Sequence, residues 1–222
     1  MNSVGDAFSF QFKDPGWVGK IVVQALILII PIVGLIALAG WMLMTFDNLR
    51  AGRQELAPAG FHLSRGIGLF GAWFIYSLVL SLPGLVLSWG STMSTFSNLS
   101  NSNYMSHPYA FSTVNASGSF LSLVGDLFLD FLLPSLIVMT YHYGFSGAMD
   151  VPRVWRLATS NVTNSVIGGL LFFVAGIIGG LGLIACCIGV FFTAAYSATV
   201  MVGVASWFER AQAVPPTPTP AA

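Results

Sequence analysis

Long uncharged stretches alternate along this chain with short stretches that carry all of its charge. Asp, Glu, Lys and Arg are absent from residues 21–46, 66–125, 131–149 and 157–208. Each stretch reaches or exceeds the roughly 18 apolar residues that a helix needs to cross a bilayer. The pattern predicts an all-α, polytopic integral membrane protein.

The first apolar stretch contains a break at Pro31 and Gly34, because proline removes a backbone hydrogen bond and glycine loosens a helix. One interpretation is a helical hairpin, with an arm over Trp17–Ile30 and a return over Val33–Leu49. The other is a single kinked helix over Ile21–Phe46. The hairpin is favoured because it keeps all eight Lys and Arg residues on one side of the membrane. Its first arm rises only about 21 Å, so we expect the turn to lie inside the bilayer.

Three further stretches complete the predicted architecture. Gly66–Trp89 and Phe120–Tyr143 are expected to be single spans. The last stretch is about twice as long as one span, which predicts helices near residues 165–185 and 188–207. The turn between them is placed at residues 186–189 and includes Gly189. The prediction is therefore about six hydrophobic segments with two helical hairpins, or five spans if the first helix is only kinked.

The positions of the arginines predict the orientation. Arg50, Arg53 and Arg65 precede the second hydrophobic region, and Arg153 and Arg156 follow the third. Because short loops rich in Lys and Arg stay in the cytoplasm, both loops are placed there. The prediction is a multi-pass protein of the cytoplasmic (inner) membrane with both termini in the cytoplasm.

Residues 1–210 are expected to form a single transmembrane domain. Within it, residues 90–118 are rich in Ser and Asn and carry no charge, which favours a flexible external loop. Residues 211–222 contain four prolines and are expected to be an extended, disordered tail. The aromatic and charged mixture of Phe8–Trp17 is typical of a membrane surface, and Asp150–Leu157 is expected to be an amphipathic surface element.

Composition agrees with this interpretation and excludes some partners. Hydrophobic residues make up 55% of the 222 residues and charged residues 7%, whereas a soluble domain carries about 25% charged residues. The net charge of zero argues against a nucleic-acid partner, which requires a basic surface. Membrane lipids are the expected surroundings.

Several local patterns resemble those of an uncharacterised family of bacterial and archaeal multi-helix membrane proteins. They are the Phe-x-Phe-x-Phe-x-Asp-Pro-x-Trp pattern of Phe8–Trp17, Ile30–Gly34, Gly40–Trp41, Asn48–Gly52, Val154–Leu157 and Ile188–Thr193. The family is a domain of unknown function, so the resemblance implies a prokaryotic membrane protein and supplies no catalytic residues.

Two carboxylates are candidates for an ion or proton site. Asp126 and Asp130 are four residues apart, so they share one face of a helix. Carboxylates inside a membrane are costly and mark ion or proton paths. The alternative is that both lie in the first turns of the third span, at the outer interface, where acidic residues also favour a helix N-terminus.

Other polar patterns indicate no catalytic or metal site. Ser146 lies in a Gly-x-Ser-Gly sequence like that of rhomboid proteases, but no His follows His142 to act as its base. His62, His107 and His142 have no second ligand three or four residues away. We therefore expect no cofactor and no metal.

Gly176 and Gly180 form a G-x-x-x-G pattern, which indicates close helix packing, either within the chain or with a second copy. Together with the lack of a catalytic constellation, this favours a non-enzymatic accessory or scaffold subunit in a homo-oligomer or a membrane-protein complex. The alternative is a small-solute or ion transporter that uses Asp130 within its helices.

Overall fold

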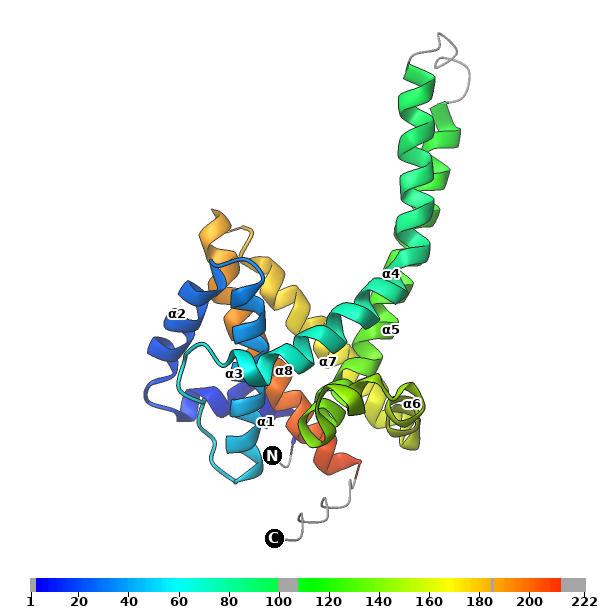
Figure 1. The fold of residues 1–222 in the computed structure, drawn as a ribbon. Helices are drawn as coiled ribbons and strands as arrows, with labels where there is room; N and C mark the ends of the chain where they lie inside the picture. The colour runs from blue at the N-terminus through cyan, green and yellow to red at the C-terminus, as the bar shows by residue number, and fades with distance from the viewer. Residues whose placement is uncertain (1–2, 100–107, 185, 213–222) are drawn as a thin grey trace. The chain divides into compact units, whose positions relative to one another are not determined.

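The computed structural model describes residues 3–99, 108–184 and 186–212, and within these ranges the regular elements are all helical (Figure 1). They are α1 Val4–Ser9, the 3-10 helix η1 Phe10–Lys13, α2 Trp17–Leu28, α3 Val33–Arg50, α4 Leu63–Leu99, α5 Pro108–Met149, α6 Val151–Ser160, α7 Val162–Leu181 and α8 Cys186–Ala211. The predicted all-α fold is confirmed, and each of the six predicted segments corresponds to one of α2, α3, α4, α5, α7 and α8.

The chain groups into two compact units. One comprises Met1–Trp73 and Asp130–Ala222, and the other comprises Phe74–Leu129. In the smaller unit α4 and α5 approach closely where Gly125 faces the carbonyl oxygen of Leu80. A single domain over residues 1–210 stays a prediction.

The first hairpin has its turn where the sequence places it. Helix α2 ends at Leu28 and α3 begins at Val33. Between them Ile32 has a φ of 64°, outside the helical region. A Cβ at Gly34 would lie 2.5 Å from the carbonyl oxygen of Ile27, so only glycine allows the two arms to come this close. The single kinked helix is therefore wrong.

The second hairpin, α7 and α8, has its turn earlier than predicted. Helix α7 ends at Leu181 and α8 already begins at Cys186, so Gly189 lies inside α8 and not in the turn. The helix ends in the glycine-rich sequence before Leu183, where Gly179, Gly180 and Gly182 weaken it. A Cβ at Gly182 would lie 2.6 Å from the carbonyl oxygen of Gly189, so these two glycines form the close contact between the arms.

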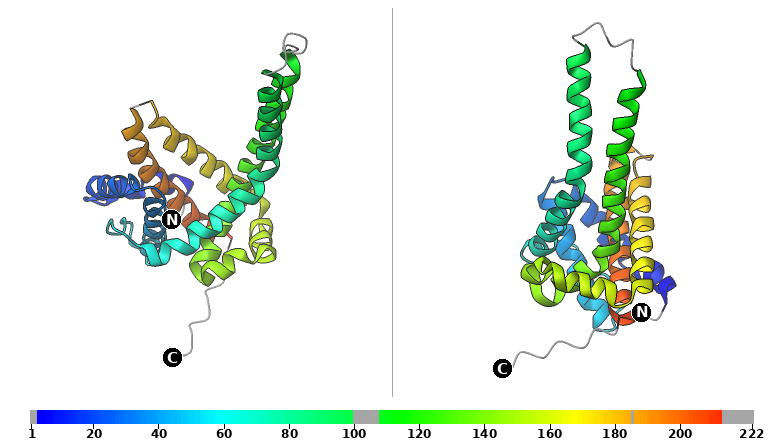
Figure 2. Two further views of the ribbon diagram at one scale, coloured as in Figure 1. Left: turned by 45° about the horizontal axis from the view of Figure 1, so that its top comes forward. Right: turned by 90° about the vertical axis from the view of Figure 1, so that its right-hand side faces the viewer.

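Helix α8 is the central helix of the larger unit and contacts α1, α2, α3 and α7 (Figure 2). Its C-terminal end lies beside that of α3, because Arg210 Nη2 donates to the carbonyl oxygen of Leu49 at 2.8 Å. Helices α3 and α8 each follow a hairpin turn, so both run from their turns toward the same end. Taking about 1.5 Å per residue, α8 extends roughly 12 Å farther than α3 toward the turns.

The N-terminal segment packs against α8 more deeply than a surface segment would. Phe10 and Gln11 are fully buried, whereas Phe12 is 53% exposed. A Cβ at Gly203 would lie 2.5 Å from the carbonyl oxygen of Ala7, which shows how closely α1 approaches α8. The ring of Phe10 is therefore covered within the chain, and the position of Phe8–Trp17 at the membrane surface stays a prediction.

Helices α4 and α5 continue into the region predicted to be a loop. Helix α4 extends to Leu99 and α5 begins at Pro108, so residues 90–99 and 108–118 are helical. Neither Pro nor Gly occurs between Ser91 and Leu99 to end a helix, and proline suits the first position of one. Residues 100–107 of this loop and 213–222 of the predicted tail lie outside the described residues.

The predicted amphipathic element is present as α6. Asp150 caps it by accepting a hydrogen bond from the backbone N–H of Arg153. Val154 and Ala158 are buried, while Trp155 is 47% exposed. The helix therefore has one covered and one open face, as the sequence predicts.

Among the described residues, four helices are long and apolar enough to cross a membrane: Leu63–Trp89 of α4, Ser119–Met149 of α5, Val162–Leu181 and Ile188–Ala211 of α8. Helix α2 is a shorter apolar helix. Twelve residues rise about 18 Å, which is less than the roughly 30 Å of bilayer hydrocarbon. This length supports the expectation that the first turn lies inside the bilayer.

Candidate functional site

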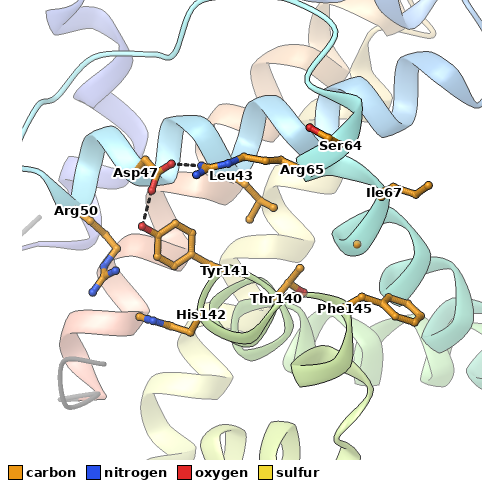
Figure 3. Close-up of a pocket in the computed structure, with 12 residues that line it drawn as sticks. Leu43, Asp47, Arg50, Ser64, Arg65, Ile67, Thr140, Tyr141, His142 and Phe145 are labelled. Carbon is orange, nitrogen blue, oxygen red and sulfur yellow. Dashed lines mark hydrogen bonds and ion pairs between the residues drawn. The ribbon is translucent and has the colours of Figure 1, made fainter. Parts of the chain in front are cut away.

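A polar pocket of about 530 Å³ lies where α3, α4 and α5 meet (Figure 3). Its charged and polar lining residues are Asp47 and Arg50 from α3, Ser64 and Arg65 from α4, and Thr140, Tyr141 and His142 from α5. All of these residues belong to the larger unit. In a chain with 7% charged residues, such a gathering is the main candidate for a functional site.

A close crossing of α3 and α4 brings Arg65 to its position. A Cβ added at Gly66 would overlap the carbonyl oxygen of Ile36, and one at Gly40 would overlap the carbonyl oxygen of His62. These two glycines let the backbones touch at the start of α4. Arg65, next to Gly66, is thereby held above the last turns of α3.

Asp47 receives two partners in the pocket. Its carboxylate pairs with the guanidinium of Arg65 and accepts a hydrogen bond from the hydroxyl of Tyr141. The guanidinium of Arg50 lies 5.1 Å from the centre of the Tyr141 ring, in cation–π geometry. The tyrosine therefore connects the two arginines, as Figure 3 shows for the Asp47 side.

Glu209 of α8 forms a second, more deeply buried pair beside the pocket. Its Oε2 lies 3.2 Å from Arg50 Nε, and its Oε1 lies 2.6 Å from His142 Nε2. The side chains of His142 and Glu209 are only 4% and 9% exposed. A carboxylate buried to this extent requires charged or hydrogen-bonding partners, and Arg50 and His142 provide them.

A separate polar contact joins the N-terminal segment to the loop after α3. Asp14 accepts hydrogen bonds from Lys20 Nζ at 2.6 Å, from the Leu56 N–H at 3.0 Å and from the Gly16 N–H at 2.9 Å. Burial by itself raises the pKa of Asp14, but Lys20 and the two backbone donors outweigh it and the pKa lies below its ordinary value. This contact is structural and does not line the pocket.

The two predicted carboxylates do not belong to the pocket. Asp126 is exposed and lies in the smaller unit, whereas Asp130 is half-buried and lies in the larger one. Near Asp130, α5 and α7 approach so closely that a Cβ at Gly169 would lie 2.9 Å from Phe131 Cα. The two aspartates therefore have different surroundings, and their role in ion or proton movement stays a prediction.

The predicted packing glycines on α7 lie on an open face. Apart from the nearby backbone of α7 itself and the adjacent residues, no heavy atom of the described residues lies within 4 Å of a Cβ at Gly176 or Gly180. The close contacts within the chain fall instead at Gly168 and Gly169, which face α5, and at Gly179, which faces α8. Of the predicted alternatives for Gly176 and Gly180, packing within the chain is not what the structure shows.

Ser146 and His142 are not arranged as a nucleophile and its base. The Ser146 hydroxyl donates to the carbonyl oxygen of Tyr143 at 3.1 Å, and His142 faces Glu209. Gly144, with φ of 66°, breaks the helix between them. His62 Nε2 contacts the carbonyl oxygen of Pro58, and His107 lies outside the described residues. Among described residues, no group of three metal-ligating side chains is found.

The sequence alone does not indicate the pocket. Its signal is modest: Asp47, Arg50 and Glu209 stand at the ends of apolar stretches, and Tyr141 and His142 stand near the end of another. Positions 142 and 209 are 67 residues apart. The pairs could have been found by matching opposite charges at the helix ends that are predicted to face the cytoplasm.

The fold and the site define an all-helical, polytopic membrane protein with a paired charge cluster near one end of its helices. Residues 23–188 match the family described as "Protein of unknown function (DUF4013)", and the chain belongs to that family. The resemblance to an uncharacterised family is thereby confirmed, although Phe8–Trp17 lies outside the matched residues. No curated protein and no solved structure matches the chain.

Proposed function

We propose that the protein is non-enzymatic and serves as an accessory or scaffold subunit of a membrane-protein complex or a homo-oligomer. The observation that carries the proposal is the mutual pairing of the charged side chains at the pocket. Asp47 contacts Arg65 and Tyr141, and Glu209 contacts Arg50 and His142. Pairs of this kind connect α3, α4, α5 and α8 and favour one rigid arrangement of the helices.

Helix α7 offers a surface on which another helix can pack. Gly176 and Gly180 are exposed, one turn apart, and open space surrounds both. Small residues at this spacing allow the backbones of two membrane helices to approach closely. We assign this face to a helix of another subunit or of a second copy.

The test is purification in mild detergent, with identification of co-eluting proteins and measurement of the oligomeric state. We compare the wild type with the double variant Gly176→Leu, Gly180→Leu. Gly19→Leu is the matched control, because Gly19 of α2 has equally open surroundings. The double variant should lose the partner or the oligomer, and the control should keep it. A wild type that elutes as a monomer without partners contradicts the proposal.

The half-buried position of Asp130 favours one other function, transport of a small solute or ion. Intramembrane carboxylates are costly and are retained along ion paths. Proton and cation flux in proteoliposomes should then fall in Asp130→Asn and stay unchanged in Asp126→Asn, whose side chain is exposed. Flux that is unchanged in both variants rules out a transport role for the carboxylate.

A further inference from the structure

An apolar pocket adjoins the polar one. It has a volume of about 220 Å³ and is lined almost entirely by apolar side chains, among them Leu35, Met42, Trp73, Ile137 and Phe172. All of its lining residues belong to the larger unit. In a membrane protein such a pocket suits the hydrocarbon part of a ligand.

The two pockets follow one another along the same three helices. On α3, Met42 lines the apolar pocket and Leu43 the polar one; on α4, Leu69 lines the apolar pocket and Gly68 the polar one. On α5, the change occurs within about one turn of Ile137. A ligand that fills both must therefore have a polar end and an apolar end, separated by roughly 10 Å along the helices.

The polar end of the ligand should be anionic. Arg50, Arg65 and Asp47 line the polar pocket, and Glu209 pairs with Arg50 beside it. The two arginines are therefore matched by two carboxylates, and the preference for an anion comes from guanidinium donors that neither carboxylate uses. Each guanidinium contacts its carboxylate through one nitrogen, Arg50 through Nε and Arg65 through Nη1. A guanidinium has five N–H groups, so donors remain on each for phosphate oxygens, which they match in geometry. The Arg65 side chain is 51% exposed and therefore accessible.

We propose that the adjoining pockets bind one anionic phospholipid, with its phosphate at Arg50 and Arg65 and an acyl chain in the apolar pocket. The bilayer supplies such a ligand directly, and basic pockets between membrane helices hold anionic headgroups. This proposal does not depend on the scaffold function, because it concerns the opposite chemistry of two cavities and not the open face of α7.

Native mass spectrometry of the detergent-purified full chain tests the proposal first without any variant. Phosphatidylglycerol and phosphatidylcholine with identical acyl chains are titrated separately, and binding should be about tenfold tighter for phosphatidylglycerol, as one charge-assisted contact provides. Equal affinities overturn the proposal. Soluble glycerol 3-phosphate should compete poorly, and competition as strong as that of the lipid overturns the assignment of an acyl chain.

Variants then locate the site. Arg65→Gln should reduce the preference for phosphatidylglycerol to within about twofold, whereas Arg156→Gln, which removes an exposed arginine of α6, should leave it unchanged. Leu35 lies at the edge of the apolar pocket and is 43% exposed. Leu35→Trp should lower the affinity for both lipids alike. Equal effects of the two arginine variants, or none from Leu35→Trp, contradict the assigned position.

Discussion

Removal of the Glu209 carboxylate tests whether the buried charge cluster stabilises the larger unit. In Glu209→Ala, His142 and Arg50 lose their partner, and both were held within 3.2 Å of it. Breaking a buried ion pair costs about 3–5 kcal/mol. Because the Arg50 side chain is 32% exposed, water can hydrate it after the carboxylate is removed. We therefore expect the free energy of unfolding to fall by about 3 kcal/mol. For a chain of this length that corresponds to a midpoint lowered by roughly 6–12 °C.

The assay is thermal unfolding in detergent, followed by the fraction of monodisperse protein in size-exclusion chromatography. Glu209→Gln keeps an acceptor for His142, so its free energy of unfolding should fall by about half as much as that of Glu209→Ala. The control is Asp150→Asn, which breaks the exposed pair with Arg153 at 2.7 Å and should cost under about 1 kcal/mol. If Glu209→Ala unfolds within about 2 °C of the control, the cluster does not stabilise the fold and this reasoning is refuted.

Other contacts give predictions of their own. The folded-state pKa of Asp14 lies below the ordinary value of 3.8, so its contribution is complete above that value and is lost as the pH falls through the lower pKa. The difference in midpoint between wild type and Asp14→Asn should therefore shrink below about pH 4, and a constant difference contradicts the ion pair. Gly34→Leu should cost more than about 3 kcal/mol because a side chain there meets the backbone of α2, whereas Gly19→Leu should stay within about 0.5 kcal/mol. A green fluorescent protein fused to the N-terminus should be bright, because the hairpin returns the terminus to the side of Arg50; an active periplasmic phosphatase at that position contradicts this orientation.

Helix positions could be predicted well where a single local cause decides them. The start of α3 at Val33 agrees with the prediction because proline and glycine interrupt the helix just there. The end of α4 could not be predicted, because Ser and Asn residues permit a helix that has already begun to continue to Leu99. The turn after α7 was misplaced by a few residues, since the close approach of Gly182 to Gly189 depends on the neighbouring helix.

The candidate site could be predicted far less well. The sequence indicates Asp126 and Asp130 as candidates because they are isolated charges in apolar sequence. Neither of them lines the polar pocket. The sequence does not distinguish Asp47 and Arg65 from other charged residues, because charged residues are common in and beside the loops of any membrane protein. Their pairing depends on the crossing at Gly66, which the sequence does not reveal.

The sequence by itself determined that this is a membrane protein built of helices, and that its first apolar stretch is interrupted at Pro31 and Gly34. These properties follow from hydrophobicity, bilayer thickness and the backbone chemistry of proline and glycine, all of which act over neighbouring residues. Only the tertiary structure decided that Glu209 meets His142 and Arg50, and that an apolar pocket adjoins the polar one. These contacts depend on which faces of helices distant in the sequence pack together, and many different packings are compatible with the same apolar pattern.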